Sequence, residues 1–136
     1  MALEPELARR SVCHLETTGR RTGLPRRIEI WFAADPSRDR IYLLSGGRDQ
    51  AHWVRNLRAD PAVRVRIADR WFDGVATEVD GGPDDPVARR ALAAKYQGWT
   101  DGAALSSWAR ESLPVVIDLS AAVAGSGSSL RDRSRG

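Results

Sequence analysis

Cysteine, histidine and lysine are scarce in this chain. Cys13 is the one cysteine among 136 residues, and the histidines are His14 and His52. A single cysteine excludes an internal disulfide, and so few soft ligands argue against a dedicated zinc or iron site. Lys95 is the sole lysine, so arginine carries nearly all of the positive charge. We therefore predict no metal, and we count only clusters of arginines as signs of function.

Long apolar runs are missing as well. No stretch approaches the ~20 apolar residues of a membrane helix, and the first residues lack the basic-then-apolar order of a signal peptide. We therefore expect a cytoplasmic protein with no integral membrane segment. With 42% hydrophobic and 29% charged residues, the composition is that of a globular chain the size of one domain. A net charge of +3 favours anionic ligands without indicating a dedicated nucleic-acid binder.

The alternation of apolar and polar residues predicts mostly strands. Val63, Val65 and Ile67 alternate with arginines in the cleanest strand signal. A strand from Arg26 to Ala34 would place Ile28, Ile30 and Phe32 on one side, with Arg27, Glu29 and Trp31 on the other. We predict strands at 11–19, 26–34, 40–45, 63–67, 71–79 and 113–119, and helices at 3–10, 50–59 and 84–97, with a shorter helix after them.

Hairpin spacing sets the fold class. Turn signals such as Asp35-Pro36 and Ala68-Asp69-Arg70 join neighbouring strands into hairpins, which favours an antiparallel, mainly β (α+β) fold rather than a parallel sheet. From Ala121 onward the chain is rich in Gly and Ser and then in Arg, with too little apolar area to offset the entropy of ordering. We predict one domain over residues 1–120 and a disordered tail over residues 121–136.

The strongest functional feature is the segment that we call the arginine turn, residues 19–27. Four arginines lie within eight of its residues, where composition would give about one. Gly19 and Gly23 allow a tight turn, and Thr22 adds a hydroxyl, so the segment offers hydrogen-bond donors and positive charge around a space of phosphate size. The alternative is a solvated basic loop beside surface carboxylates. The arginines are Arg20, Arg21, Arg26 and Arg27.

A second feature is Ser45-Gly46-Gly47, followed by a predicted helix that carries His52, Trp53 and Asn56. The spacing matches neither a Walker motif nor a dinucleotide fingerprint. Trp53 and Leu57 lie one helical turn apart and could belong to the core rather than to a cofactor platform, and Asn56 could face solvent.

Together these blocks resemble a known family in order and spacing. They are Gly19-Arg20-Arg21-Thr22-Gly23-x-Pro25-Arg26, then Ser45-Gly46-Gly47, then Trp53-x-x-Asn56-Leu57-x-x-Asp60-Pro61. The pattern resembles the deazaflavin-dependent nitroreductase family over nearly the whole chain except the tail. The resemblance implies an antiparallel split β-barrel with inserted helices, of the flavin-reductase and pyridoxamine-phosphate-oxidase kind, which is often a homodimer and binds coenzyme F420, an 8-hydroxy-5-deazaflavin.

The resemblance also implies roles for particular residues. The arginine turn would meet the cofactor phosphate and its polyglutamate tail, and the second feature would line the ring system. The predicted cofactor-binding residues are therefore Arg20, Arg21, Thr22, Arg26 and Arg27 for the tail, Ser45, Gly46, Gly47, Trp53 and Asn56 for the ring, with Ile28, Ile30 and His52 completing the set.

The chain departs from the family in three places. Glu29 stands where the family commonly has proline, and the region between Gly47 and Trp53 lacks the usual prolines. The tyrosines that related nitroreductases present before the last strand are replaced around residues 102–105, which leaves Tyr96, Trp99 and Trp108 as the nearby aromatic residues. Tyr96 is our candidate for protonating the product, with a structural role as the alternative.

The activity that we predict is transfer of hydride from reduced coenzyme F420 to a small electron-poor acceptor such as a quinone, a nitroaromatic or an enone. Two alternatives stay open: a reductase that holds flavin mononucleotide in the same barrel, and a non-catalytic deazaflavin carrier or anion-binding module.

Other activities have weaker support. Ser45 lacks the context of a nucleophile elbow, so hydrolysis is disfavoured. The carboxylates are scattered along strands, which gives a glycosidase no paired acids. Arg64, Arg66 and Trp71 with Phe72 could track a single nucleic-acid strand, but a half-solvated strand explains the same pattern, and we predict no nucleic-acid partner.

Overall fold

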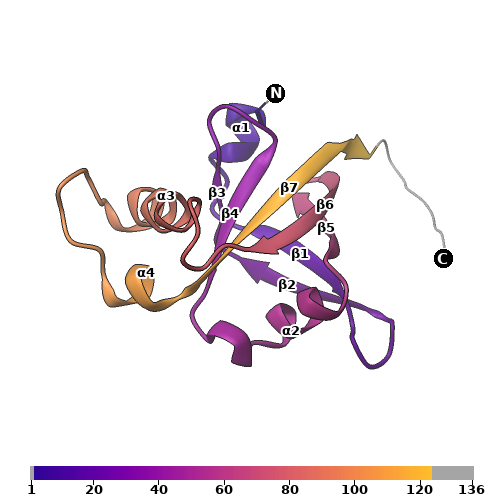
Figure 1. Cartoon of the computed structure of the whole chain (residues 1–136). Coiled ribbons are helices and arrows are strands. Elements are labelled where there is room, and N and C mark those ends of the chain that lie inside the picture. Colours follow the sequence, from indigo (N-terminus) through magenta and orange to yellow (C-terminus); the bar gives the residue numbers. More distant parts are fainter. Residues whose placement is uncertain (1, 124–136) are drawn as a thin grey trace.

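Seven strands form one antiparallel sheet that curls into a split β-barrel (Figure 1). The computed structural model describes residues 2–123. The order across the sheet is β2-β1-β5-β6-β7-β4-β3, and every neighbouring pair is antiparallel. This confirms the predicted fold class. The strands are β1 (Cys13–Thr18), β2 (Pro25–Ile30), β3 (Ala33–Ala34), β4 (Arg40–Ser45), β5 (Ala62–Ile67), β6 (Arg70–Glu78) and β7 (Leu113–Val123).

The prediction of one continuous strand from Arg26 to Ala34 is wrong. The segment forms β2 and β3, which are consecutive in sequence but lie at opposite edges of the sheet. At the crossing, the backbone of Phe32 is bonded by side chains instead of a neighbouring strand: its N–H donates to the Tyr96 hydroxyl at 3.1 Å, and the Lys95 ammonium donates to its carbonyl at 2.8 Å. These two bonds explain how the strand can break without leaving the backbone groups of Phe32 unpaired.

The other strands follow the predictions closely. β4 has the predicted bounds, and Val63, Val65 and Ile67 of β5 are buried while the arginines between them are half-buried on the opposite face. β7 continues to Val123, where it pairs with Trp71 of β6. The first three residues of the predicted tail therefore belong to the sheet, and residues 124–136 lie outside the described part of the chain.

Two hydrophobic cores lie on opposite faces of the sheet. The first fills the inside of the barrel, where Leu15, Ile41 and Ile117 are fully buried. The second lies between the outer face of β4 and the helix α3 (Asp85–Gln97), where Tyr42 and Leu92 are buried. The short helix α4 (Ser107–Glu111) joins this second core (Figure 1). Helices therefore cover the outer face of the sheet around β3 and β4.

The remaining helices are α1 (Pro5–Ala8) and α2 (His52–Ala59). The predicted start of α2 at Gln50 is early, because Arg48–Gln50 forms a separate turn of 3₁₀ helix, η1. On α2, Val54 and Leu57 are buried, and Leu57 packs into the barrel core. Within residues 2–123, no helix is long and apolar enough to cross a membrane.

Candidate functional site

The arginine turn joins β1 to β2 and depends on its two glycines. The Gly19 N–H donates to the Leu24 carbonyl at 2.8 Å, and Gly23 has φ of +72°, which favours glycine. A Cβ at Gly19 would lie 2.9 Å from the Thr22 Oγ1, so no larger residue fits without a shift. The Thr22 hydroxyl in turn accepts a hydrogen bond from the Leu24 N–H at 3.1 Å. The turn is therefore held by hydrogen bonds within itself, from its backbone and from the Thr22 hydroxyl.

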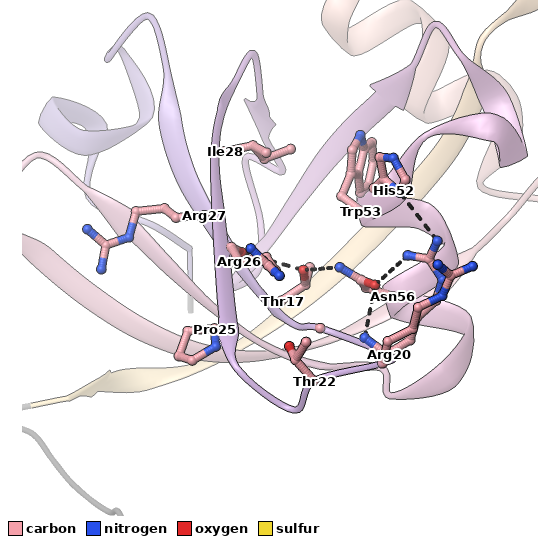
Figure 2. Close-up of a pocket in the computed structure, with 12 residues that line it drawn as sticks. Thr17, Arg20, Thr22, Pro25, Arg26, Arg27, Ile28, His52, Trp53 and Asn56 are labelled. Carbon is pink, nitrogen blue, oxygen red and sulfur yellow. Dashed lines mark hydrogen bonds between the residues drawn. The ribbon is translucent and has the colours of Figure 1, made fainter.

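Asn56 of α2 fastens this turn to the barrel (Figure 2). Its Oδ1 accepts hydrogen bonds from the backbone N–H of Arg20 at 3.2 Å and from the Arg20 guanidinium at 2.9 Å, and its Nδ2 donates to the Thr17 hydroxyl at 3.1 Å. Asn56 is buried, so the suggestion that it could face solvent is wrong. A second guanidinium nitrogen of Arg20 lies 3.3 Å from the His52 Nδ1. Arg20 is thus oriented by two side chains of α2.

A cavity of about 610 Å³ lies between the arginine turn, β2 and α2, a size within the range of small-molecule sites. Arginine and histidine are the only charged or titratable residues among those that border it, since no acidic residue does. Figure 2 shows Trp53 and Ile28 at one end and Arg20 at the other. The twelve bordering residues are Thr17, Gly19, Arg20, Arg21, Thr22, Pro25, Arg26, Arg27, Ile28, His52, Trp53 and Asn56.

The arginines of the cavity differ in their partners. Among residues 2–123, no carboxylate oxygen lies within 4.0 Å of the guanidinium of Arg20, Arg21 or Arg26. Arg27 borders the cavity, but its guanidinium points away from the others (Figure 2) and lies 4.0 Å from the Glu16 carboxylate. Three guanidinium groups therefore remain to meet an anion from outside the chain.

Nine of the thirteen predicted cofactor-binding residues border this cavity. The four that do not are Ile30, Ser45, Gly46 and Gly47. Ser45 is buried, and its hydroxyl donates to the Arg48 carbonyl at 3.0 Å. Three bordering residues were absent from the prediction: Thr17, Gly19 and Pro25. Thr17 faces Arg26 across β1 and β2, a relation that the sequence alone does not reveal because it depends on strand register.

A second cavity, of about 510 Å³, lies beyond the end of β2. Trp31 and Trp108 border it, with ring centroids 5.4 Å apart and planes at 82°. Trp31 also stacks on Tyr96, with centroids 4.3 Å apart and planes at 3°. The cavity is bordered by Val12, Glu29, Ile30, Trp31, Leu44, Gln97 and Trp108.

Tyr96 lies outside the first cavity. Besides accepting from the Phe32 N–H, its hydroxyl lies 2.7 Å from the Ser11 carbonyl and 2.8 Å from that of Phe32. Burial raises the pKa of Tyr96. Because its proton is held by the backbone, these contacts favour the structural role over that of proton donor. Its neighbour Lys95 also bonds the carbonyls of Ala8 and Arg10, and burial lowers the pKa of Lys95 to about 8.

No metal centre is evident in the described part of the chain, where no three His, Cys, Asp or Glu residues are grouped so that they could hold an ion. Burial raises the pKa of the Cys13 thiol to about 12, so this thiol is a poor metal ligand.

Solved structures with the same fold support this description. A conserved hypothetical protein from Mycobacterium tuberculosis is 21% identical, with a TM-score of 0.69 over 100% of this chain and 93% of that one. An F420-H2 dependent reductase, FDR-A, is 23% identical, with a TM-score of 0.57 over 82% and 95%. A putative pyridoxamine 5'-phosphate oxidase from Listeria innocua is 17% identical, with a TM-score of 0.62 over 86% and 90%. At these identities the likeness shows the split-barrel fold.

The family itself is shown by the sequence. The model of the F420H(2)-dependent quinone reductase family matches residues 4–120, which is most of the chain. This match confirms the resemblance to deazaflavin-dependent reductases that the arginine turn and the two following motifs suggested. The chain belongs to the F420H(2)-dependent quinone reductase family and is an F420-dependent oxidoreductase, with coenzyme F420 as its main cofactor.

Proposed function

We propose that the first cavity holds coenzyme F420 by its anionic tail and that the protein passes hydride to a quinone or another electron-poor acceptor. One observation carries the cofactor assignment: Arg20, Arg21 and Arg26 border a cavity without any acidic residue, and their guanidinium groups have no carboxylate partner within residues 2–123. Guanidinium forks match phosphate oxygens, and unpaired positive charge in a cavity favours an anion. The residues present therefore fit a phosphorylated cofactor.

Each residue has a distinct part in this proposal. Arg20 is held in place by Asn56 and His52, so little side-chain entropy is lost when it meets a phosphate. Arg21 and Arg26 supply further guanidinium groups on either side of the turn. The flat, half-buried ring of Trp53 offers a surface against which a planar ring can pack. When bound, the reduced deazaflavin supplies the hydride, and the protein supplies its position.

The acceptor follows from the family name and from the resemblance. Quinones, nitroaromatics and enones are all electron-poor molecules that can accept a hydride, and the family that matches the chain is named for quinone reduction. Because the Tyr96 hydroxyl is bonded to the carbonyls of Ser11 and Phe32, solvent at the cavity mouth is the proton source that we propose for the product.

Titration with two cofactors tests the proposal. Purified protein is titrated with coenzyme F420 and with flavin mononucleotide, and the change in cofactor fluorescence gives each Kd. We expect the deazaflavin to bind at least tenfold more tightly, and the reduced form to be oxidised when 1,4-naphthoquinone is added. Tighter binding of flavin mononucleotide would favour the flavin reductase instead. Tight deazaflavin binding with no turnover of any acceptor would favour the carrier.

Two further expectations come from the resemblance and the sequence, and both remain predictions. We propose that the protein forms a homodimer and acts in the cytoplasm. Light scattering behind size-exclusion chromatography measures the mass in solution, and a mass of one chain at micromolar concentration would contradict the dimer.

A further inference from the structure

The chain turns a corner between β4 and α2, and Arg48 stands at that corner. Its φ is +50°, in the left-handed region that glycine adopts freely and other residues rarely adopt. For a non-glycine residue, the steric cost makes this conformation roughly tenfold less populated than the right-handed one in an unconstrained chain. The two preceding residues are Gly46 and Gly47, yet the left-handed position itself is filled by arginine. Contacts made by Arg48 must therefore hold the corner.

The guanidinium of Arg48 supplies such contacts. One of its nitrogens donates to the Asp80 carboxylate at 2.6 Å, in the loop between β6 and α3, and another donates to the Glu111 carbonyl at the end of α4. The second oxygen of the Asp80 carboxylate accepts from the Arg89 guanidinium at 3.0 Å, which fixes Asp80 in turn. The side chain of Arg48 is therefore anchored to the segments around α3 and α4.

The carbonyl of Arg48 holds the corner from the other side. It accepts hydrogen bonds from the Ser45 hydroxyl at 3.0 Å and from the Ala51 N–H at 3.4 Å. Ser45 is the last residue of β4, and Ala51 immediately precedes α2. One residue thus connects the end of the strand with the start of the helix.

The corner also fixes the direction of α2. Arg55 of α2 donates from its Nε to the Asp49 carbonyl at 3.0 Å and from a second nitrogen to the Gln50 side chain at 2.8 Å. Asp49 and Gln50 belong to η1. These bonds join η1 to α2, so both elements follow the backbone of Arg48 as one unit.

The helix α2 forms one wall of the first cavity. It contributes His52, Trp53 and Asn56, and Figure 2 shows two of these side chains bonded to Arg20. A change in the direction of α2 would therefore displace the Trp53 ring and also the side chains that orient Arg20. Arg48 itself borders neither cavity, so any influence on the first one must pass through the helix.

From these contacts we propose that Arg48 is a positioning residue for cofactor binding, which acts through α2 and without touching the cofactor. Its anchored guanidinium keeps the left-handed corner, and the corner keeps α2 at the first cavity. The inference rests on the proposed function, because its effect on affinity needs the cofactor in that cavity. Without the anchor, only the fraction of molecules that keeps the corner binds as the wild type does, and the apparent Kd rises by the inverse of that fraction.

Two substitutions at this position test the proposal. Arg48→Ala removes the guanidinium and keeps the cost of the left-handed backbone, whereas Arg48→Gly removes both. We expect Arg48→Ala to raise the Kd for coenzyme F420, measured by cofactor fluorescence, by about tenfold. Arg48→Gly should raise it only about twofold, because glycine populates positive and negative φ about equally. Rescue by glycine distinguishes a backbone position from the loss of a surface charge or of general stability.

Ala68→Gly is the matched control. Ala68 is the other non-glycine residue with positive φ in residues 2–123, at +57°, and it lies in the turn between β5 and β6, away from the border of the first cavity. This variant should leave the Kd for coenzyme F420 unchanged, and circular dichroism checks that all three variants are folded.

A measurement without the cofactor tests the link between the corner and the arginine turn directly. The Arg20 N–H donates to the Asn56 Oδ1 of α2, so displacement of the helix should expose this amide. Hydrogen exchange of the Arg20 amide, followed by NMR, should be faster in Arg48→Ala than in the wild type, with Arg48→Gly between them and Ala68→Gly unchanged.

An unchanged Kd in Arg48→Ala, or a Kd in Arg48→Gly as high as that in Arg48→Ala, would overturn the positioning role. So would an equal rise in Ala68→Gly. If the wild-type protein does not bind coenzyme F420, the proposed function fails, and exchange of the Arg20 amide then decides alone. Faster exchange in Arg48→Ala supports the positioning of α2 by Arg48, and unchanged exchange overturns it.

Discussion

Arginine has opposite uses at the two ends of this molecule. On α3, Arg89 is buried, and its guanidinium donates to the carboxylates of Asp80 and Asp85 and to the carbonyls of Ala109, Arg110 and Ser112. In the arginine turn, by contrast, the guanidinium groups of Arg21 and Arg26 border an open cavity without a carboxylate partner in the described residues.

The difference shows why counting arginines says little about function. The hydrogen-bond donors of Arg89 are satisfied within the fold, where they connect α3 to α4 and to the residue before β7. In the turn, the guanidinium groups of Arg21 and Arg26 have no side-chain or carbonyl partner within residues 2–123, so solvent or a ligand can take up their hydrogen bonds. We therefore expect substitutions at Arg89 to change stability, and substitutions in the turn to change affinity.

Replacing Arg89 should have the largest effect. Arg89→Met keeps a long apolar side chain but leaves two carboxylates and three carbonyls without their donor. Breaking a buried charged network costs about 3–5 kcal/mol, so urea unfolding should show a loss of that order. Arg90→Met, at the next and exposed position, is the control and should lose less than about 0.5 kcal/mol. Equal losses would show that Arg89 contributes no more than a surface residue.

The same network should appear in the pH dependence of stability. The hydrogen bond from Arg89, aided by the Gly81 N–H against the effect of burial, lowers the pKa of Asp85 from 3.8. The native state therefore binds fewer protons than the unfolded state near that pH, so the contribution of Asp85 is complete above pH 3.8 and is lost as pH falls through the native pKa. As pH is lowered, the free energy of unfolding measured with urea should decrease less in Arg89→Met than in the wild-type protein. A parallel loss in both would rule out this linkage.

Replacing Arg26 should affect affinity rather than stability. A charge-assisted hydrogen bond contributes about 1.5–3 kcal/mol, so Arg26→Ala should raise the Kd for coenzyme F420 by about ten- to a hundredfold. The change should largely vanish for the deazaflavin ring that lacks its phosphate. Arg27→Ala is the matched control, because its guanidinium points away from the cavity toward Glu16 (Figure 2), and it should weaken binding less. If Arg26→Ala raises the Kd of both ligands by the same factor, the phosphate assignment is wrong and the turn is a solvated basic loop.

Replacing Asn56 should affect both properties, since it connects the turn to the barrel. Asn56→Leu leaves the Arg20 N–H without its acceptor and removes the hydrogen bond donated to the Thr17 hydroxyl, and one unpaired buried group costs about 1–3 kcal/mol. Unfolding experiments should show that loss, and cofactor titration should show weaker binding because Arg20 is no longer oriented. Unchanged affinity in a folded Asn56→Leu protein would mean that Arg20 does not bind the cofactor.

Deleting residues 125–136 should have the smallest effect. The segment has no apolar periodicity that could dock it on the domain. Thermal unfolding and cofactor titration should give the wild-type Tm and Kd. A clear drop in either would assign this segment to the site or to an interface between subunits.

The sequence anticipated which residues surround the first cavity better than the path of the chain around it. The family resemblance grouped the arginine turn with His52, Trp53 and Asn56, and these residues border one cavity, while their binding of the cofactor stays a prediction. The break at Phe32 could not be predicted, because alternation continues through it and the partners that satisfy the Phe32 backbone lie on α3, far away in sequence. The clustering of four arginines in the sequence was misleading in part, since strand alternation sends the side chains of Arg26 and Arg27 to opposite faces of β2 (Figure 2).

The crossing between β2 and β3 has a consequence for the order in which the protein folds. β4 and β6 are joined only through β7, and Arg40 near the start of β4 pairs with Asp118 near the end of the domain. The β1–β2 and β5–β6 hairpins can form locally. The β3–β4 pair can join them only through β7, which lies between β6 and β4 in the sheet. Since pairings between distant segments are slow and come late, we expect this barrel to close only after the ribosome has synthesised and released β7.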